Sequence, residues 1–341
     1  KLAGLKVKTS NLCSEITLPT GQDNDGNQRT AVCCLSSLNI DTYDQWSEDP
    51  QFIEDVMRFL DNVMTDFINR APDEFAHAKY SAMRERSVGL GVMGLHSYFQ
   101  QKNIPFGSVM SKVWNKKIFK NIQEKVDLAS VSLAEERGAC PDAAEYGMKE
   151  RFSNKTAIAP TASISIICGG SSPGIEPIAA NSYTHKTLSG SFNVRNKYLK
   201  KILQKHKKDT DDVWSTITTN QGSVAHLDFL TPDEKDTFKT AFEIDQRWIV
   251  ELGADRTPHI SQAQSINIFI PADIHKKDLH DLHFQAWKKG LKSLYYCRSK
   301  SIQRAENVNK GSSTDVTKNV YSQGQESNNE SNNYEECLSC Q

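Results

Sequence analysis

The sequence predicts an α/β protein in which helices alternate with short, buried, parallel strands. Long segments with apolar residues at helical spacing are separated by short apolar runs of strand length. Hydrophobic residues make up 38% of the 341 residues and charged residues 24%, which is typical of a globular protein with a sizeable core. No run approaches the roughly 18 apolar residues that a membrane-spanning helix needs.

The charge balance and the cysteines restrict the class of protein. Lys and Arg number 41 and Asp and Glu number 42, which gives a formal net charge of −1. This balance excludes an overall basic field for nucleic acid and an acidic, solvating chain. Eight cysteines without a secretory signal predict free thiols in a reducing, cytoplasmic compartment.

The helices are predicted from periodicity and from stop signals. The clearest covers residues 51–70, where apolar residues recur at helical spacing from Phe52 to Phe67 and Pro72 ends the run. Three others are predicted at residues 108–137 with Gly138 as the stop, at residues 232–252, and at residues 273–289 with a stop near Gly290.

Short apolar runs predict strands at residues 156–159, 163–167, 265–270 and 292–296. The run GLGVMG at residues 89–94 matches G-x-G-x-x-G. It lacks a preceding strand signal, and no acidic residue lies between Arg86 and Gln123, so a dinucleotide site is excluded. Close backbone packing at these glycines is the better explanation.

The last 40 residues differ in composition. Residues 311–333 are rich in Ser, Asn and Gln and predict a flexible tail, so the chain divides into residues 1–300 and residues 301–341. The tail ends in Cys337 and Cys340, whose C-x-x-C spacing favours a reversible disulfide over half of a zinc site or no role. A flexible tail of about 37 residues reaches on average ~30–37 Å, far enough to visit a buried site.

Two further segments place thiols where chemistry is possible. In an extended loop Asn11, Cys13 and Glu15 would face the same side, although a surface loop with a chance cysteine explains them equally well. Cys33 and Cys34 lie in an apolar run and would point to opposite faces, so at most one faces a site. Two packed cysteines remain an even alternative.

The hydroxyl- and glycine-rich stretch at residues 160–174 suits a phosphate cradle, but Gly/Ser loops are common. Tyr295 and Tyr296 end a strand-like run. Adjacent tyrosines usually pack, yet tyrosine is also reversibly oxidised to a radical. Periodicity does not choose between these readings.

In this order the motifs resemble the large, catalytic subunit of class I ribonucleotide reductase. The finger loop of that family is similar to SNLCSEI, and the strand with one reducing cysteine is similar to AVCCLSSLNI. PTASISIICGGSSPGIEP resembles the substrate-phosphate loop, LYYC the radical-relay tyrosines, and CLSC the tail dithiol. The tyrosine pair favours the class that depends on a small subunit over the cobalamin-dependent class.

The resemblance implies a fold and a set of roles. The fold would be the second half of a ten-stranded α/β barrel with its finger loop, followed by the flexible tail. A radical would pass through Tyr296 and Tyr295 to Cys13, which would abstract the 3′ hydrogen of a ribonucleoside diphosphate. Glu15 would act as general base, with Asn11 hydrogen-bonding nearby.

The remaining roles concern electrons and phosphate. Cys33 and a second cysteine would reduce the substrate and form a disulfide, which Cys337 and Cys340 would then reduce by exchange. The substrate phosphates would bind at three hydroxyls, those of Thr161, Ser163 and Ser165.

The resemblance also implies partners outside this chain. They are a polypeptide with the first half of the barrel, a small subunit with a diiron or related dimetal radical cofactor, and thioredoxin or glutaredoxin. ATP and deoxynucleotide effectors would bind mainly to the N-terminal half. No metal site, membrane or nucleic-acid contact is expected in this chain, which alone should not turn over nucleotides.

A split gene, as in some phages, and a fragment of a longer chain are equally consistent with the sequence. A phage product would work in the host cytoplasm. Two other functions remain alternatives: a non-catalytic half-barrel that only binds other subunits, and a stand-alone thiol redox or zinc protein.

Overall fold

A computed structural model describes residues 5–187 and 190–299. Its strands are β1 (Gly21–Gln22), β2 (Gln28–Arg29), β3 (Cys34–Asn39), β4 (Val88–Met93), β5 (Ser182–Thr187), β6 (Gly190–Arg195), β7 (Ile268–Ile270) and β8 (Cys297–Ser299). Its helices are α1 (Tyr43–Trp46), α2 (Phe52–Arg70), α3 (Ala76–Glu85), α4 (Leu95–Gln101), α5 (Val109–Arg137), α6 (Pro141–Ala144), α7 (Ile164–Ile167), α8 (Lys197–Lys205), α9 (Asp211–Thr219), α10 (Pro232–Thr237), α11 (Arg247–Arg256) and α12 (Lys276–Lys288). Short 3₁₀ turns lie at Ile40–Thr42, Asp73–Phe75 and Thr257–His259.

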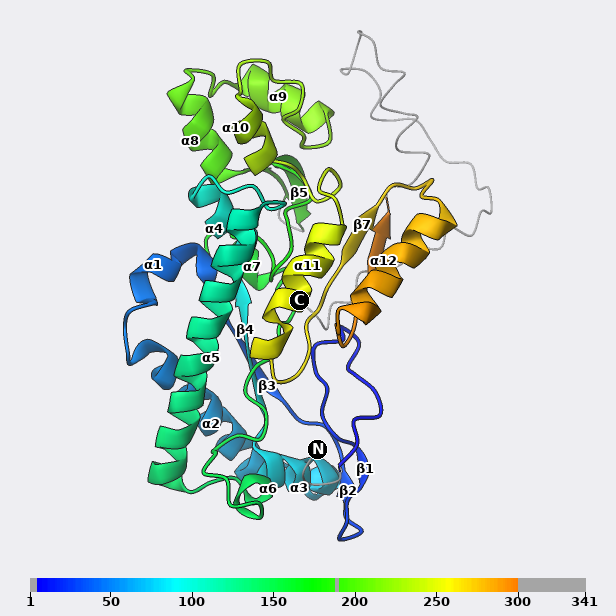
Figure 1. Cartoon of the computed structure of the whole chain (residues 1–341). Coiled ribbons are helices and arrows are strands. Elements are labelled where there is room, and N and C mark those ends of the chain that lie inside the picture. Colours follow the sequence, from blue (N-terminus) through cyan, green and yellow to red (C-terminus); the bar gives the residue numbers. More distant parts are fainter. Residues whose placement is uncertain (1–4, 188–189, 300–341) are drawn as a thin grey trace, which may run out of the picture.

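Parallel strand segments lie side by side in chain order. β3 pairs with β4, Leu90 of β4 forms a parallel bridge with Thr156, and Ile158 forms one with Gln264. β7 then pairs in parallel with β8. Helices separate most of these segments along the chain, as Figure 1 shows. The predicted α/β architecture with parallel pairing is therefore confirmed.

The glycines of β4 let its neighbours approach. A Cβ atom on Gly91 would lie 2.4 Å from the carbonyl oxygen of Ala157, and one on Gly89 would lie 2.5 Å from the Leu35 side chain. Only glycine avoids these clashes, so the G-x-G-x-x-G run serves close packing, as the sequence predicted. All six residues of β4 are buried.

Helices α2, α5 and α11 pack together over the strands to form the main core. The helix predicted at residues 108–137 is confirmed, with Ser108 as N-cap and Gly138 after the last turn. In α2 the buried stripe is Ile53, Met57, Leu60 and Met64, whereas Phe59 on the opposite face is 61% exposed.

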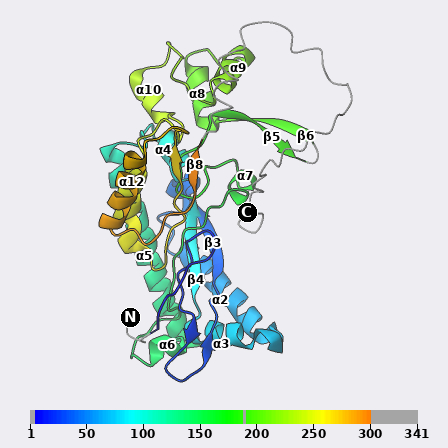
Figure 2. The same cartoon turned by 90° about the vertical axis from the view of Figure 1, so that its right-hand side faces the viewer.

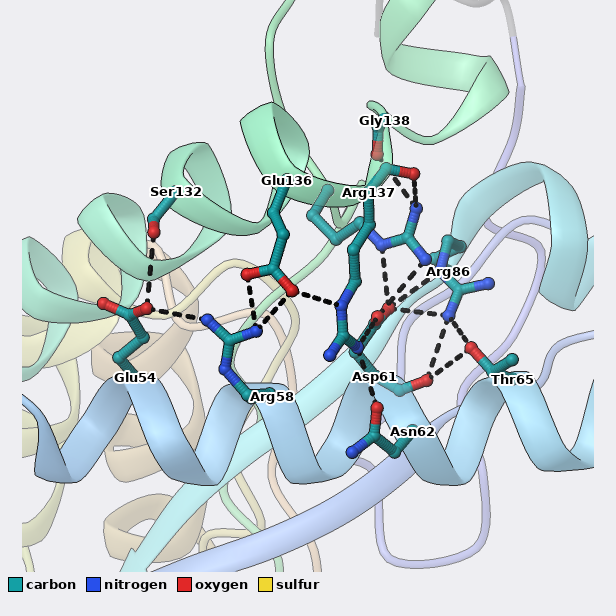
Figure 3. Close-up of polar contacts among 11 residues, drawn as sticks. Glu54, Arg58, Asp61, Asn62, Thr65, Arg86, Ser132, Glu136, Arg137 and Gly138 are labelled. Carbon is teal, nitrogen blue, oxygen red and sulfur yellow. Dashed lines mark hydrogen bonds and ion pairs between the residues drawn. The ribbon is translucent and has the colours of Figure 1, made fainter.

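Figure 3 shows an ionic network where α2 meets the end of α5. The carboxylate of Asp61 is fully buried and pairs with Arg86 at 2.6 Å, Arg137 at 2.9 Å and Arg151 at 2.9 Å. Burial alone would raise the pKa of Asp61, but the three guanidinium groups hold it below its ordinary value. The Asp61 side chain thus links segments that are far apart in the sequence.

The helix predicted at residues 232–252 is wrong, because the structure divides it into α10 and α11. The N–H and hydroxyl of Thr240 donate to the Glu243 carboxylate, both at 2.8 Å. The N–H of Ala241 donates to the carbonyl of Ile178. Backbone groups used in this way cannot continue a helix.

The strand predicted at residues 163–167 is also wrong, because this run forms the short helix α7. Thr161 has a φ of 54° and its carbonyl accepts from the N–H of Ser165, which turns the chain into a helical direction. Apolar runs this short do not distinguish a strand from a helix by periodicity. The strand predicted at 292–296 begins later, at Cys297, although the Tyr295 N–H already donates to the Ile266 carbonyl.

A second hydrophobic cluster joins α8, α9 and α10 at one end of the molecule, around Trp214 and Leu203. The adjacent hairpin of β5 and β6 projects away from the helices in Figure 2. Within residues 5–187 and 190–299, no helix combines the length and the apolar character needed to cross a membrane. The tail, with Cys337 and Cys340, lies outside the described residues.

Candidate active site

The segment around Cys13 forms a turn rather than the extended loop that the sequence predicted. Ser14 has a φ of 63°, its N–H donates to the Asn11 carbonyl, and the Asn11 Oδ1 accepts from the N–H of Ile16 at 3.0 Å. The shared-face argument for Asn11, Cys13 and Glu15 was therefore wrong. Within the turn, the Asn11 side chain forms a hydrogen bond with the Glu15 carboxyl group.

Long-range hydrogen bonds fix this turn against the strands. The Glu15 carbonyl accepts from the N–H of Ala263, and the Ser14 carbonyl accepts from the Ser293 hydroxyl at 2.9 Å. The Ser14 hydroxyl donates to the Leu294 carbonyl at 3.2 Å. Cys13 and Glu15 are consequently 1% and 2% exposed, which excludes the surface-loop alternative.

Cys13 contacts Tyr295, the first of the two adjacent tyrosines. Its Sγ is in hydrogen-bond contact with the Tyr295 hydroxyl at 3.5 Å. The rings of Tyr295 and Tyr296 are 4.0 Å apart between centroids and inclined by 34°. Tyr296 is 43% exposed, so the three side chains form a contact path from the surface to a buried sulfur.

Glu15 is a buried carboxyl group two residues after Cys13 in the same segment. Burial raises its pKa, and a hydrogen bond with the Asn11 side chain opposes part of that rise. Among the described residues its Oε2 atom has no hydrogen-bond partner. A carboxylate held in this way is a stronger base than one in water.

Cys33 and Cys34 are both free and partly exposed, and Cys33 is the one that bonds to a residue of this region, Gln262. Burial raises its pKa to about 12, and the charge of Glu15 adds to the rise. Gln262 opposes it, since its Nε2 donates to the Cys33 Sγ at 3.3 Å. The structure therefore brings Cys33 into electrostatic reach of the Cys13 turn.

The three hydroxyls expected to bind phosphate have different surroundings. The Thr161 Oγ1 accepts from the Gly174 N–H at 2.7 Å, and the Ser165 hydroxyl donates to the Ala162 carbonyl at 3.2 Å. Both residues are buried, whereas Ser163 is half-buried. The hydroxyls of Thr161 and Ser165 thus form hydrogen bonds within the loop itself.

Two residues that the sequence reasoning missed hold Tyr296. The Asn267 Oδ1 accepts from the Tyr296 N–H at 2.9 Å, while its Nδ2 donates to the buried carboxyl of Glu176 at 2.6 Å. Burial raises the pKa of Glu176 to about 7, against the hydrogen bond from Asn267 and the charge of Arg298. The available signal was a carboxyl group within PGIEP, directly after the phosphate-like loop.

No cluster of three or more His, Cys, Asp or Glu side chains suited to a metal ion occurs in the described part of the chain. The described residues present a site of cysteine, carboxyl and tyrosine side chains, in which Cys33 carries a free thiol. Its members come from the N-terminal turn, the segment before β3, and the strand segments around residues 262–267 and 295–296.

Known proteins are similar to this chain over most of its length. The model of the ribonucleotide reductase barrel domain matches residues 2–146 and 142–297. The chain is 49% identical over 300 residues to the ribonucleoside-diphosphate reductase large subunit of Invertebrate iridescent virus 6, covering 87% of this chain and 31% of that protein. It is 44% identical over 317 residues to that of Invertebrate iridescent virus 3, covering 92% of this chain and 49% of the relative.

A solved structure is also similar. The class Id ribonucleotide reductase alpha subunit of Actinobacillus ureae superimposes with a TM-score of 0.80 at 40% identity, covering 87% of this chain and 54% of that one. The chain thus spans between about a third and a half of the curated relatives' length and about half of that structure. The chain therefore belongs to the ribonucleotide reductase family, as its finger-loop, phosphate-loop and tyrosine motifs predicted.

Proposed function

We propose that this chain carries the catalytic part of the large subunit of a ribonucleoside-diphosphate reductase. It reduces ribonucleoside diphosphates to deoxyribonucleoside diphosphates by a thiyl-radical mechanism. The observation that carries the proposal is the contact path from Tyr296 through Tyr295 to the buried Cys13 sulfur. The half-exposed Tyr296 is where a radical from a separate subunit enters.

The reaction begins at Cys13. Tyr295 takes the hydrogen atom of the Cys13 thiol, and the thiyl radical takes the 3′ hydrogen of the ribose. Glu15 accepts the 3′-hydroxyl proton, for which its burial and its raised pKa suit it. The hydroxyl group at C2′ takes a proton from one thiol of the reducing pair that contains Cys33 and leaves as water. The buried setting of Cys13 protects the radical from solvent.

Cys33 and a second cysteine then supply two electrons and form a disulfide, and Cys13 returns its hydrogen to C3′. We propose that Cys337 and Cys340 reduce this disulfide by thiol–disulfide exchange, and that thioredoxin or glutaredoxin restores them. In this proposal, residues 1–300 act as the barrel part and residues 301–341 carry the redox dithiol. Thr161, Ser163 and Ser165 form the substrate-phosphate loop.

The proposal includes partners. The dimetal radical cofactor belongs to the small subunit, and nucleotide effectors bind mainly to the N-terminal half of the large subunit. The rest of the barrel comes from that half, on the same or a separate polypeptide. In support, the described residues provide no strand for the outer edges of β3 and β8.

The test uses the enzyme reconstituted with the rest of the barrel, the small subunit and a thiol reductant. Cys13→Ser and Tyr295→Phe should each lower deoxynucleotide formation by roughly 10³-fold or more. Cys140→Ser and Tyr80→Phe, which change the same residue types away from the site, should retain activity. Full activity in Cys13→Ser would overturn the proposal.

The same preparation separates the alternatives. No nucleotide reduction with every component present would favour a half-barrel that only binds other subunits. Stoichiometric zinc in the purified protein would favour a separate thiol redox or zinc protein.

A further inference from the structure

Gln262 lies at the junction of three segments of the site. Its side chain is 0% exposed. The Nε2 atom donates to the Cys33 Sγ at 3.3 Å and to the Val88 carbonyl at 3.2 Å, and the Oε1 atom accepts from the Thr17 N–H at 3.2 Å. One amide thus joins the segment before β3, the start of β4 and the chain just after the Cys13 turn.

The orientation of this amide follows from its partners. The N–H of Thr17 is a donor, so it requires the oxygen of the Gln262 side chain. Val88 offers a carbonyl oxygen, which requires one of the two N–H groups. The second N–H then points at Cys33, and a rotated amide would lose two hydrogen bonds. The Cys33 sulfur therefore accepts a hydrogen bond from Gln262.

Among the main influences of the described residues on the Cys33 thiol, this hydrogen bond is the one that lowers its pKa. Burial is the largest cause of the raised pKa of Cys33, and the charges of Cys34, Glu15 and Glu85 act in the same direction. These groups face Cys33 from its own segment, from the Cys13 turn and from the end of α3. Gln262 is the group that favours the thiolate.

We propose that Gln262 is a further catalytic residue, which orients Cys33 and stabilises its thiolate when the disulfide containing Cys33 is reduced. This inference deepens the proposed function and rests on it. An attacking dithiol donates two electrons as one of its sulfurs bonds to the second cysteine of the disulfide. The bond to Cys33 breaks, and Cys33 leaves as a thiolate that accepts the Gln262 N–H bond. A leaving thiolate stabilised in this way leaves faster.

Iodoacetamide alkylation of Cys33 tests the inference without relying on turnover. The reconstituted enzyme is reduced, freed of reductant, and treated with iodoacetamide at a series of pH values, and the Cys33 peptide is quantified by mass spectrometry. Gln262→Leu removes the N–H donor at nearly constant volume. The alkylation rate at a given pH below the thiol pKa should fall on the order of tenfold, because hydrogen bonds to charged groups are the stronger kind.

Gln264→Leu is the matched control. Gln264 is also a buried glutamine, two residues along the same segment, but it bonds to Arg256, Gly253 and Thr257 rather than to Cys33. Its substitution should leave the Cys33 alkylation rate within about twofold of the wild type, since it removes no bond to the sulfur. Gln262→Glu keeps an acceptor for Thr17 but offers no N–H to Cys33, and should slow alkylation as Gln262→Leu does.

The outcomes separate this inference from the proposed function. Equal alkylation rates in Gln262→Leu, Gln264→Leu and the wild type would overturn the role of Gln262, even if Cys13→Ser is inactive. Full nucleotide reduction in Cys33→Ser would overturn the role of Cys33 in turnover, while the alkylation rates would still report whether Gln262 acts on the thiol.

Discussion

At the level of single residues, Glu15 lowers the stability of the folded state when ionised, and the same burial makes its carboxylate a better proton acceptor. Its carboxyl group is buried, and within the described ranges its Oε2 lacks a hydrogen-bond partner. Because burial raises its pKa, the folded state binds the proton more tightly than the unfolded state, so the ionised group destabilises the fold above its unfolded pKa.

Glu15→Gln should abolish nucleotide reduction yet raise the free energy of unfolding at pH 7 by about 1 kcal/mol. The gain should shrink as the pH falls below both pKa values, and denaturant titrations at pH 7 and pH 4 measure it. A loss of stability at pH 7 would contradict this account.

At the scale of secondary structure, Asp61 fastens α2 to the end of α5 and to the segments of Arg86 and Arg151 (Figure 3). Removing one member of a buried ionic network leaves the others unpaired, so Asp61→Ala should lower the free energy of unfolding by about 3–5 kcal/mol. Asp66→Ala is the control on the same helix, because the Asp66–Arg70 pair is exposed and should contribute less than about 1 kcal/mol.

The stabilisation by Asp61 should depend on pH. Since the folded pKa of Asp61 is lowered, its stabilisation is present above its ordinary pKa and is lost as the pH falls through the folded value. The melting temperatures of the two variants should therefore become similar at acidic pH. Equal losses of unfolding free energy in Asp61→Ala and Asp66→Ala at neutral pH would show that the buried network does not stabilise the fold.

At the scale of the whole molecule, the order of the parallel segments leaves two outer edges. β4 has neighbours on both sides, whereas in the described part of the chain β3 and β8 each pair on one side. The three residues of β8 are exposed, and Leu35 of β3 is 40% exposed. Unpaired edges bind further strands. Amide hydrogen exchange should therefore slow in β3 and β8 when the rest of the barrel is added, while β4 stays protected throughout. Unchanged exchange in β3 and β8 would mean that these edges do not close the barrel.

Predictions from local signals were the accurate ones. The capping serine and terminal glycine set the ends of α5, and the apolar spacing with Pro72 set α2, because these signals act within one or two helical turns. The order of the short motifs also identified the family. In contrast, the helix predicted at residues 232–252 fails where Ala241 bonds to Ile178, a distant contact that no local pattern encodes. The strand predicted at residues 163–167 fails for another reason, because periodicity does not distinguish a strand from a helix in so short an apolar run.

The sequence by itself therefore determined the α/β class, the helices α2 and α5 and the family, and it supplied the candidate site residues. Only the tertiary structure decided which of those side chains meet. Cys13 contacts Tyr295 across 282 residues, and Cys33 accepts from Gln262 across 229. Such contacts follow from the parallel order of the strands and from the packing of helices over them, which bring distant segments together. The partners Gln262, Asn267 and Glu176 emerged only there, because a buried amide has no periodic signature along the chain.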